Sequence, residues 1–123
     1  MLGSRNLVAF VATTNAPRAR AFYEKVLGLR FVADDPFALV FDAHATMLRI
    51  QKVEKLTPPG HTTLGWEVPD IAATARALRD AGVKCERFQG MDQDELGIWA
   101  SPGGAKVAWF KDPDGNTLSL TQF

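Results

Sequence analysis

The apolar positions of this chain form one series of patterns that occurs twice. Alternating apolar residues over Leu7–Ala12 predict a strand, and the helical spacing that follows predicts a helix. This helix is expected to begin at Asn15, which suits an N-cap, and to end at Gly28. Three short strand patterns then cover Arg30–Ala33, Phe37–Phe41 and Met47–Lys52. The first half therefore predicts a strand, a helix and three strands.

The same order returns after a loop at residues 53–61. Thr62–Val68 form a strand pattern, and a helix is expected between the N-cap Asp70 and Gly82. Three more strand regions follow, at Lys84–Phe88, at Leu96–Ala100 with its hairpin partner Ala105–Phe110, and at Thr117–Gln122. Residues Asp112 to Gly115 suit the four positions of a type I turn before the last strand. A sheet covered by a helix on one side keeps its other face free, so each half is expected to expose one sheet face.

Composition and charge narrow the class of protein. The 123 residues are 46% hydrophobic, which is enough for one compact domain that buries roughly two thirds of its unfolded surface. Fourteen basic and fourteen acidic residues balance, so neither nucleic acid nor an anionic membrane is an expected partner. A single cysteine, Cys85, excludes an internal disulfide, and no secretion signal or membrane span is visible. We therefore expect a soluble, cytoplasmic protein with a small-molecule partner.

Three stretches carry a family resemblance: NAPRARAFYEKVLGL in the first half, VPDIAATARALRDAGV in the second, and WFKDPDGNTLSLTQ at the end. Together they resemble the vicinal oxygen chelate superfamily, which includes glyoxalase I, extradiol dioxygenases, fosfomycin-resistance enzymes and bleomycin-binding proteins. The resemblance covers nearly the whole chain. It implies an α+β fold in which one domain, residues 1–123, consists of two βαβββ modules at about 1–57 and 61–123. It further implies sheets that curl into a cleft, and a homodimer.

Strand parity selects the side chains on the free sheet faces, because alternate residues of a strand point to opposite faces. In the last strand Leu118 and Leu120 are expected under the helix, which leaves Ser119 and Thr121 on the free face. The same parity is expected to bury Leu7. Applied to all the strands, it predicts ten ligand-binding residues: Val8, Phe10, Arg49, Gln51, His61, Thr63, Glu67, Trp109, Ser119 and Thr121.

In metal-dependent members of the superfamily, His, Gln or Glu side chains from four strands hold a divalent ion. The FY, VPD and DPDGN stretches align those positions with Val8, Arg49, Thr63 and Ser119 here. None of the four is a usual ligand of a divalent cation, and Arg49 adds a positive charge. His61 lies two residues before Thr63, but a single His without acidic or Cys partners does not form a useful site. We therefore predict no metal and no other cofactor.

Three functions from different classes stay open, so whether the protein is an enzyme stays open too. The favoured one is a metal-free binding protein for an anionic or carbonyl-bearing small molecule, with Ser119 and Thr121 as hydrogen-bond partners and Arg49 as the charged anchor. The second is a lyase, isomerase or dioxygenase with a rearranged site around His61 and Glu67. The third is a non-catalytic interaction module whose cleft is filled by its own side chains. An ion pair between Arg49 and Glu67, which would close the cleft, competes with the anchor interpretation.

Overall fold

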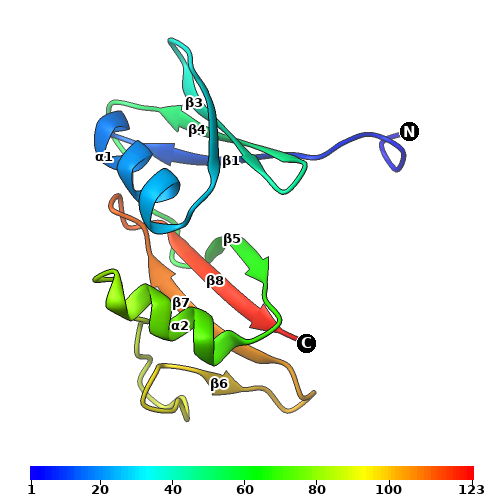
Figure 1. The fold of residues 1–123 in the computed structure, drawn as a ribbon, viewed down its shortest axis with the longest axis vertical. Coiled ribbons are helices and arrows are strands. Elements are labelled where there is room, and N and C mark those ends of the chain that lie inside the picture. The colour runs from blue at the N-terminus through cyan, green and yellow to red at the C-terminus, as the bar shows by residue number, and fades with distance from the viewer. The chain divides into compact units, whose positions relative to one another are not determined.

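The computed structural model describes residues 1–123 and divides them into two compact units, 1–57 and 58–123 (Figure 1). The first unit contains, in chain order, β1 (Val8–Thr13), α1 (Ala16–Ala21), the π-helix η1 (Phe22–Val26), β2 (Arg30–Asp34), β3 (Ala38–Ala43) and β4 (Thr46–Lys52). The second unit contains β5 (Thr62–Glu67), α2 (Ile71–Asp80), β6 (Trp99–Ala100), β7 (Lys106–Lys111) and β8 (Thr117–Gln122). None of the helices has the length and apolar character that crossing a bilayer requires.

Each unit folds its four strands into one mixed sheet with the same strand order. The orders are β1-β4-β3-β2 and β5-β8-β7-β6. In both sheets the first strand pairs in parallel with the last, and the other pairs are antiparallel. The predicted α+β class with two βαβββ modules is therefore confirmed. We call residues 1–57 the first module and residues 58–123 the second module.

Local signals begin and end the helices as the sequence predicts. The side chains of Asn15 and Asp70 each accept a hydrogen bond of 3.1 Å from a first-turn backbone amide. Gly28 follows the first helix with a φ of +75°, a conformation that glycine adopts without steric cost. The sequence pattern does not predict the π-helical turn, in which the amide of Leu27 bonds the carbonyl of Phe22 five residues earlier.

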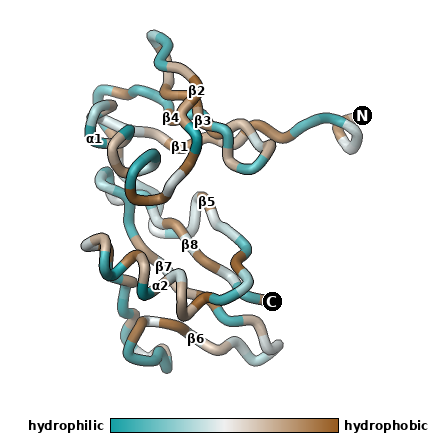
Figure 2. Tube along the Cα trace, viewed as in Figure 1, coloured by the Kyte–Doolittle hydropathy of each residue, from teal (hydrophilic) through white to brown (hydrophobic).

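Strand parity identifies the helix-covered face of each sheet correctly. Leu48 and Ile50 of β4, like Leu118 and Leu120 of β8, are fully or almost fully buried. In Figure 2 the strands β7 and β8 include brown, hydrophobic segments. The prediction for Leu7 is wrong, because this residue precedes the first pair of β1 and is 74% exposed. We call the face of each sheet away from its helix the open face.

The predicted strand at Lys84–Phe88 is also wrong. One backbone bond of 2.7 Å joins this segment to the sheet, from the amide of Glu86 to the carbonyl of Trp109. The side chain of Gln93 bonds the neighbouring backbone groups instead. It accepts from the amide of Phe88 and donates to two carbonyl oxygens, one of them that of Glu86. These backbone amide and carbonyl groups therefore have hydrogen-bond partners without a neighbouring strand. The second strand of this module is instead the short β6.

Leu78 on α2 tests the packing of the second module, because it is 5% exposed and lies on the buried side of the helix with Ile71 and Ala75. We expect Leu78→Ala to lower the free energy of unfolding by about 2 to 5 kcal/mol, as large-to-small changes in packed interiors do. The control is Arg76→Ala on the exposed side of α2, expected to change it by less than about 0.5 kcal/mol. Urea denaturation measures both, and equal effects would contradict the packing.

Candidate functional site

Four of the predicted ligand-binding residues lie on the open face of the first module. The register pairs Val8 with Met47 and Phe10 with Arg49 across β1 and β4, and Gln51 follows two residues later on the same side. Val8 and Phe10 are 42% and 56% exposed, so β1 presents an apolar surface next to Arg49. Val8 and Met47 are among the residues that line a cavity of about 460 Å³.

Arg49 forms an ion pair within its own module. Its guanidinium lies 3.0 Å from Oδ2 of Asp35, in the turn between β2 and β3. The other oxygen of Asp35 accepts 2.8 Å bonds from the amides of Phe37 and Ala38. These two amides, and then Arg49, lower the pKa of the Asp35 carboxyl below its ordinary value. The partner that sequence reasoning considered, Glu67, is replaced by Asp35, and Arg49 is less able to serve as a free charged anchor.

Trp109 lies at the centre of the open face of the second module. Its ring packs edge-on against Phe88, with centroids 5.4 Å apart, and lies 6.1 Å from the ring of Trp99. The indole Nε1 donates a 3.1 Å hydrogen bond to Oγ1 of Thr62. The aromatic ring is therefore held in place by packing on two sides and by one polar contact.

The Trp109 ring accounts for the burial of Ser119. β8 lies between β7 and β5, so an indole that starts on β7 and reaches Thr62 on β5 crosses β8. Ser119 pairs with Trp109 in the register and is 8% exposed. On its other side is Gly65, where an added Cβ would lie 2.5 Å from the Ser119 hydroxyl oxygen. Ser119 is therefore little accessible to a ligand, and Thr121, which is half-buried, is the more accessible of the two hydroxyls.

Parity predicts that Thr63 faces a ligand, and in the structure its hydroxyl is bonded within its own sheet. An irregularity between Thr62 and Leu64 shifts the register of β5, so that Thr62 is the residue opposite Thr117. The Thr63 hydroxyl donates a 3.1 Å bond to the carbonyl of Thr117 in its own sheet. A β-bulge of this kind reverses the side-chain alternation on one side of it, which a regular period of two cannot anticipate.

A cavity of about 330 Å³ opens beside Trp109 on this face. It is lined by Gly60, His61, Thr62, Phe88, Met91, Trp109, Lys111 and Thr117. Lys111 Nζ donates a 2.8 Å bond to the Thr117 hydroxyl, and no carboxylate of the module lies within ion-pair distance of it. Sequence reasoning missed Lys111, although it has the same strand parity as Trp109. The cavity thus combines an aromatic wall with one unneutralised cation.

His61 and Glu67 lie at opposite ends of β5. His61 precedes the strand and lines the Trp109 cavity, whereas Glu67 ends the strand opposite Thr121. At the rise of an extended strand, their α-carbons are separated by roughly 15 Å or more. Two groups that share a proton or a metal must approach to within a few ångströms, about 3 Å for a hydrogen bond. This arrangement does not favour a centre built from both.

The structure shows what two of the side chains contact at the positions that the resemblance aligns with the superfamily's metal ligands. Those positions correspond to Val8, Arg49, Thr63 and Ser119, as the resemblance implies. Arg49 is paired with a carboxylate, and the Thr63 hydroxyl bonds backbone. No group of three or more His, Cys, Asp or Glu side chains is close enough to hold an ion.

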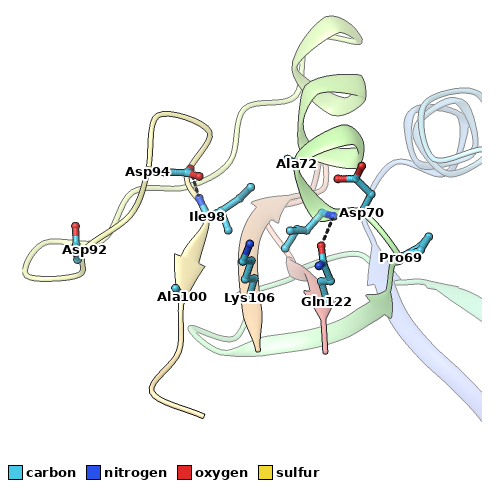
Figure 3. Close-up of a pocket in the computed structure, with 10 residues that line it drawn as sticks. Pro69, Asp70, Ala72, Asp92, Asp94, Ile98, Ala100, Lys106 and Gln122 are labelled. Atoms are coloured by element: carbon cyan, nitrogen blue, oxygen red, sulfur yellow. Dashed lines mark hydrogen bonds between the residues drawn. The ribbon is translucent and has the colours of Figure 1, made fainter. Parts of the chain in front are cut away.

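Another cavity of the second module, about 590 Å³, lies on its helix-covered side and contains none of the predicted site residues (Figure 3). Lys106 rises between the Asp92–Ile98 loop and the first turn of α2. Two amides of that turn already have side-chain partners, because Asp70 accepts from Ala73 and the Gln122 side chain accepts from Ile71. This helix end is therefore capped by the protein itself.

A family model for the Glyoxalase/Bleomycin resistance protein/Dioxygenase superfamily matches residues 6–120. The chain belongs to this superfamily, which confirms the resemblance carried by its helix and turn sequences. No curated protein matches the sequence.

Solved structures of the superfamily share the fold at low sequence identity. Lactoylglutathione lyase from Agrobacterium tumefaciens has a TM-score of 0.76 at 17% identity, covering 99% of this chain and 96% of its own. A superfamily member from Sphaerobacter thermophilus has a TM-score of 0.72 at 23% identity, covering 95% and 97%. A fosfomycin resistance protein from Listeria monocytogenes has a TM-score of 0.74 at 11% identity, covering 98% and 93%. These likenesses establish the fold and leave the ligand to be argued from the residues.

The Asp35 carboxylate predicts a specific pH dependence of stability. Because its folded pKa is lowered, its contribution is fully present above the ordinary value of 3.8 and is lost as the pH falls through the folded value. We expect Asp35→Asn to be less stable than wild type near neutral pH, with a difference that narrows below about pH 4. Urea denaturation across this range measures the difference. The exposed Asp80→Asn serves as the control, and a constant Asp35→Asn difference would contradict the stabilisation of the Asp35 carboxylate by these amides and Arg49.

Proposed function

We propose that the protein is a metal-independent small-molecule binding protein of the superfamily whose ligand is an organic anion with an apolar, planar body. The observation that carries the proposal is the cavity in which Trp109 and Phe88 lie beside the unneutralised Lys111. Its volume of about 330 Å³ is at the small end of ligand pockets, which span about 300 to 1,000 Å³. A metabolite of one or two rings suits it.

Each part of the cavity supplies a different component of affinity. The rings of Trp109 and Phe88 remove apolar ligand surface from water, and their perpendicular packing leaves a defined wall for a planar group. Lys111 carries three N–H donors, of which Thr117 takes one. A carboxylate, sulfonate or carbonyl oxygen can accept another, and a bond to a charged donor is stronger than a neutral one.

Arg49 is not the charged anchor in this proposal. Asp35 neutralises part of its charge at 3.0 Å, so an anion gains less from Arg49 than from Lys111. Its guanidinium still has donors beyond the one that Asp35 accepts. The charged anchor is therefore assigned to Lys111, whose cavity lies within the second module.

An enzymatic role is the second candidate, and His61 favours it. This imidazole lines the same cavity as Lys111, so it can act as a general base toward a ligand whose anionic group Lys111 holds. One structural neighbour is named a lactoylglutathione lyase, which supports considering an enzymatic role. In this form of the proposal Glu67 has no part, because it lies at the far end of β5.

A pair of probes that differ in one group tests the ligand class. Anilinonaphthalene sulfonate is an anionic aromatic dye, and phenylnaphthylamine is the same ring system without the sulfonate. We expect Lys111→Met to raise the fluorescence-derived Kd of the sulfonate by about tenfold and to leave that of phenylnaphthylamine within about twofold, because one charged contact is lost. The matched control is Lys106→Met, on the same strand but the opposite face, which should change neither value.

Two outcomes would contradict the proposal. Equal losses for both dyes in Lys111→Met would show that the sulfonate does not contact the lysine. A tightly held, stoichiometric divalent ion in the purified protein would return His61 to the role of a metal ligand. In the proposed case zinc, nickel and manganese leave the melting temperature unchanged, since an ion that bound the folded state would raise it.

We further propose that the protein is a homodimer whose modules pair edge to edge, as the family resemblance implies. Both sheets have outer strands with one unpaired edge in their own module, and such edges are usually covered. Sedimentation velocity over a hundredfold concentration range is expected to give a dimer of the 13.5 kDa chain. A monomer at every concentration would end this proposal without affecting the dye experiment.

A further inference from the structure

A third cavity of the second module lies between α2 and the segment that follows it. Its volume is about 310 Å³, and it is lined by Ala75, Arg79, Lys84, Cys85, Arg87, Glu95 and Leu96. Cys85 and Arg87 face this side, whereas Phe88 packs on Trp109 across the sheet. The cavity is therefore separate from the one to which the dye probes are directed.

Arg87 is fixed in position without being neutralised. Its two terminal nitrogens donate to the backbone carbonyls of Asp94 and Glu95, the second at 2.7 Å. Both acceptors are uncharged, and Arg87 forms no ion pair. A guanidinium has five N–H donors, so it retains capacity for a ligand while its orientation is held by the loop.

Two further cations line the same space. Lys84 has no ion pair, and Arg79 has a contact of 3.6 Å with its exposed neighbour Asp80. The lining contains one carboxylate, Glu95, which pairs with none of the three cations.

Two other acidic groups lie near Cys85. They are Asp94, whose Oδ1 already accepts from two backbone amides, and Glu86. The lining itself therefore carries more positive than negative charge.

We propose that this cavity binds a phosphate group, with Arg87 and Lys84 as its principal donors. Arginine matches the geometry of a tetrahedral oxyanion through paired N–H bonds, and lysine adds a mobile point charge. The volume is close to that of the Trp109 cavity, so it admits a phosphate group together with part of a molecule that carries it. The group can come from free inorganic phosphate or from a phosphorylated metabolite that extends out of the cavity.

Cys85 is a built-in reporter of occupancy, because it is the single cysteine of the chain and lines the cavity. Burial raises the pKa of its thiol, so modification is slow enough to follow by absorbance. The rate is measured with neutral dithiodipyridine on the folded full-length protein. Inorganic phosphate is added as the probe, with sodium chloride at matched ionic strength. We expect phosphate to slow the reaction at least threefold at saturation, and chloride to leave it unchanged.

The variants decide which residues hold the anion. Lys84→Gln removes a charge that makes no bond in the protein, and is expected to raise the phosphate concentration for half-protection by about fivefold or more. Arg87→Gln should have a larger effect, but it also removes two loop contacts, so Lys84→Gln is the cleaner test. Arg76→Gln, on the exposed side of α2, serves as the matched control and should behave as wild type.

Adenosine monophosphate distinguishes the two sources of the group. Tighter protection by the nucleotide than by phosphate supports a phosphorylated metabolite, and equal protection supports free phosphate. Absence of protection, or protection that chloride reproduces or that Lys84→Gln leaves intact, overturns the proposal. Sulfonate dye binding should be the same in Lys84→Gln as in wild type, so failure here and failure of the proposed ligand site are distinguishable.

Discussion

The parallel pairing of the first and last strand in each module is the constraint on which the rest of the structure depends. Two parallel neighbours cannot be joined by a hairpin, so the chain must cross over one face of the sheet. In both modules the helix follows the first strand and covers that face, as the burial of Leu48 and Leu118 shows. The opposite face is left open by topology alone. Trp109, Arg49 and Lys111 can therefore face outward without weakening the core.

The open faces of the two modules differ in how their positive charges are paired. In the first module the carboxylate of Asp35 accepts from two backbone amides and pairs with Arg49. The positive charge of Arg49 therefore mainly stabilises the turn between β2 and β3. In the second module Lys111 has only a hydroxyl partner, and the aromatic ring beside it is fixed by Thr62. The duplicated architecture thus provides one structural and one available cation. Internal duplication of a fold does not require duplication of its chemistry.

Sequence reasoning succeeded where the information is local and failed where it is not. The caps at Asn15 and Asp70 and the alternation in β8 depend on neighbouring residues, and both were predictable. The partner of Arg49 is fourteen residues away, in a turn whose shape decides which carboxylate reaches it. The shift at Thr63 requires a bulge that no period reveals. Lys111 was within reach of the parity rule, and only its lack of an acidic partner needed the structure.

Gln93 shows how little separates a loop from a strand at one edge of the fold. Its single amide group makes three hydrogen bonds to backbone at Glu86, Phe88 and Gly97, which occupies the groups that a neighbouring strand would otherwise pair. A superfamily member with an apolar or shorter residue at this position lacks these side-chain hydrogen bonds. The backbone groups that correspond to Glu86 and Phe88 must then find partners along β7. One substitution can therefore exchange secondary structure at this edge during evolution, while the three remaining strands of the sheet keep their register.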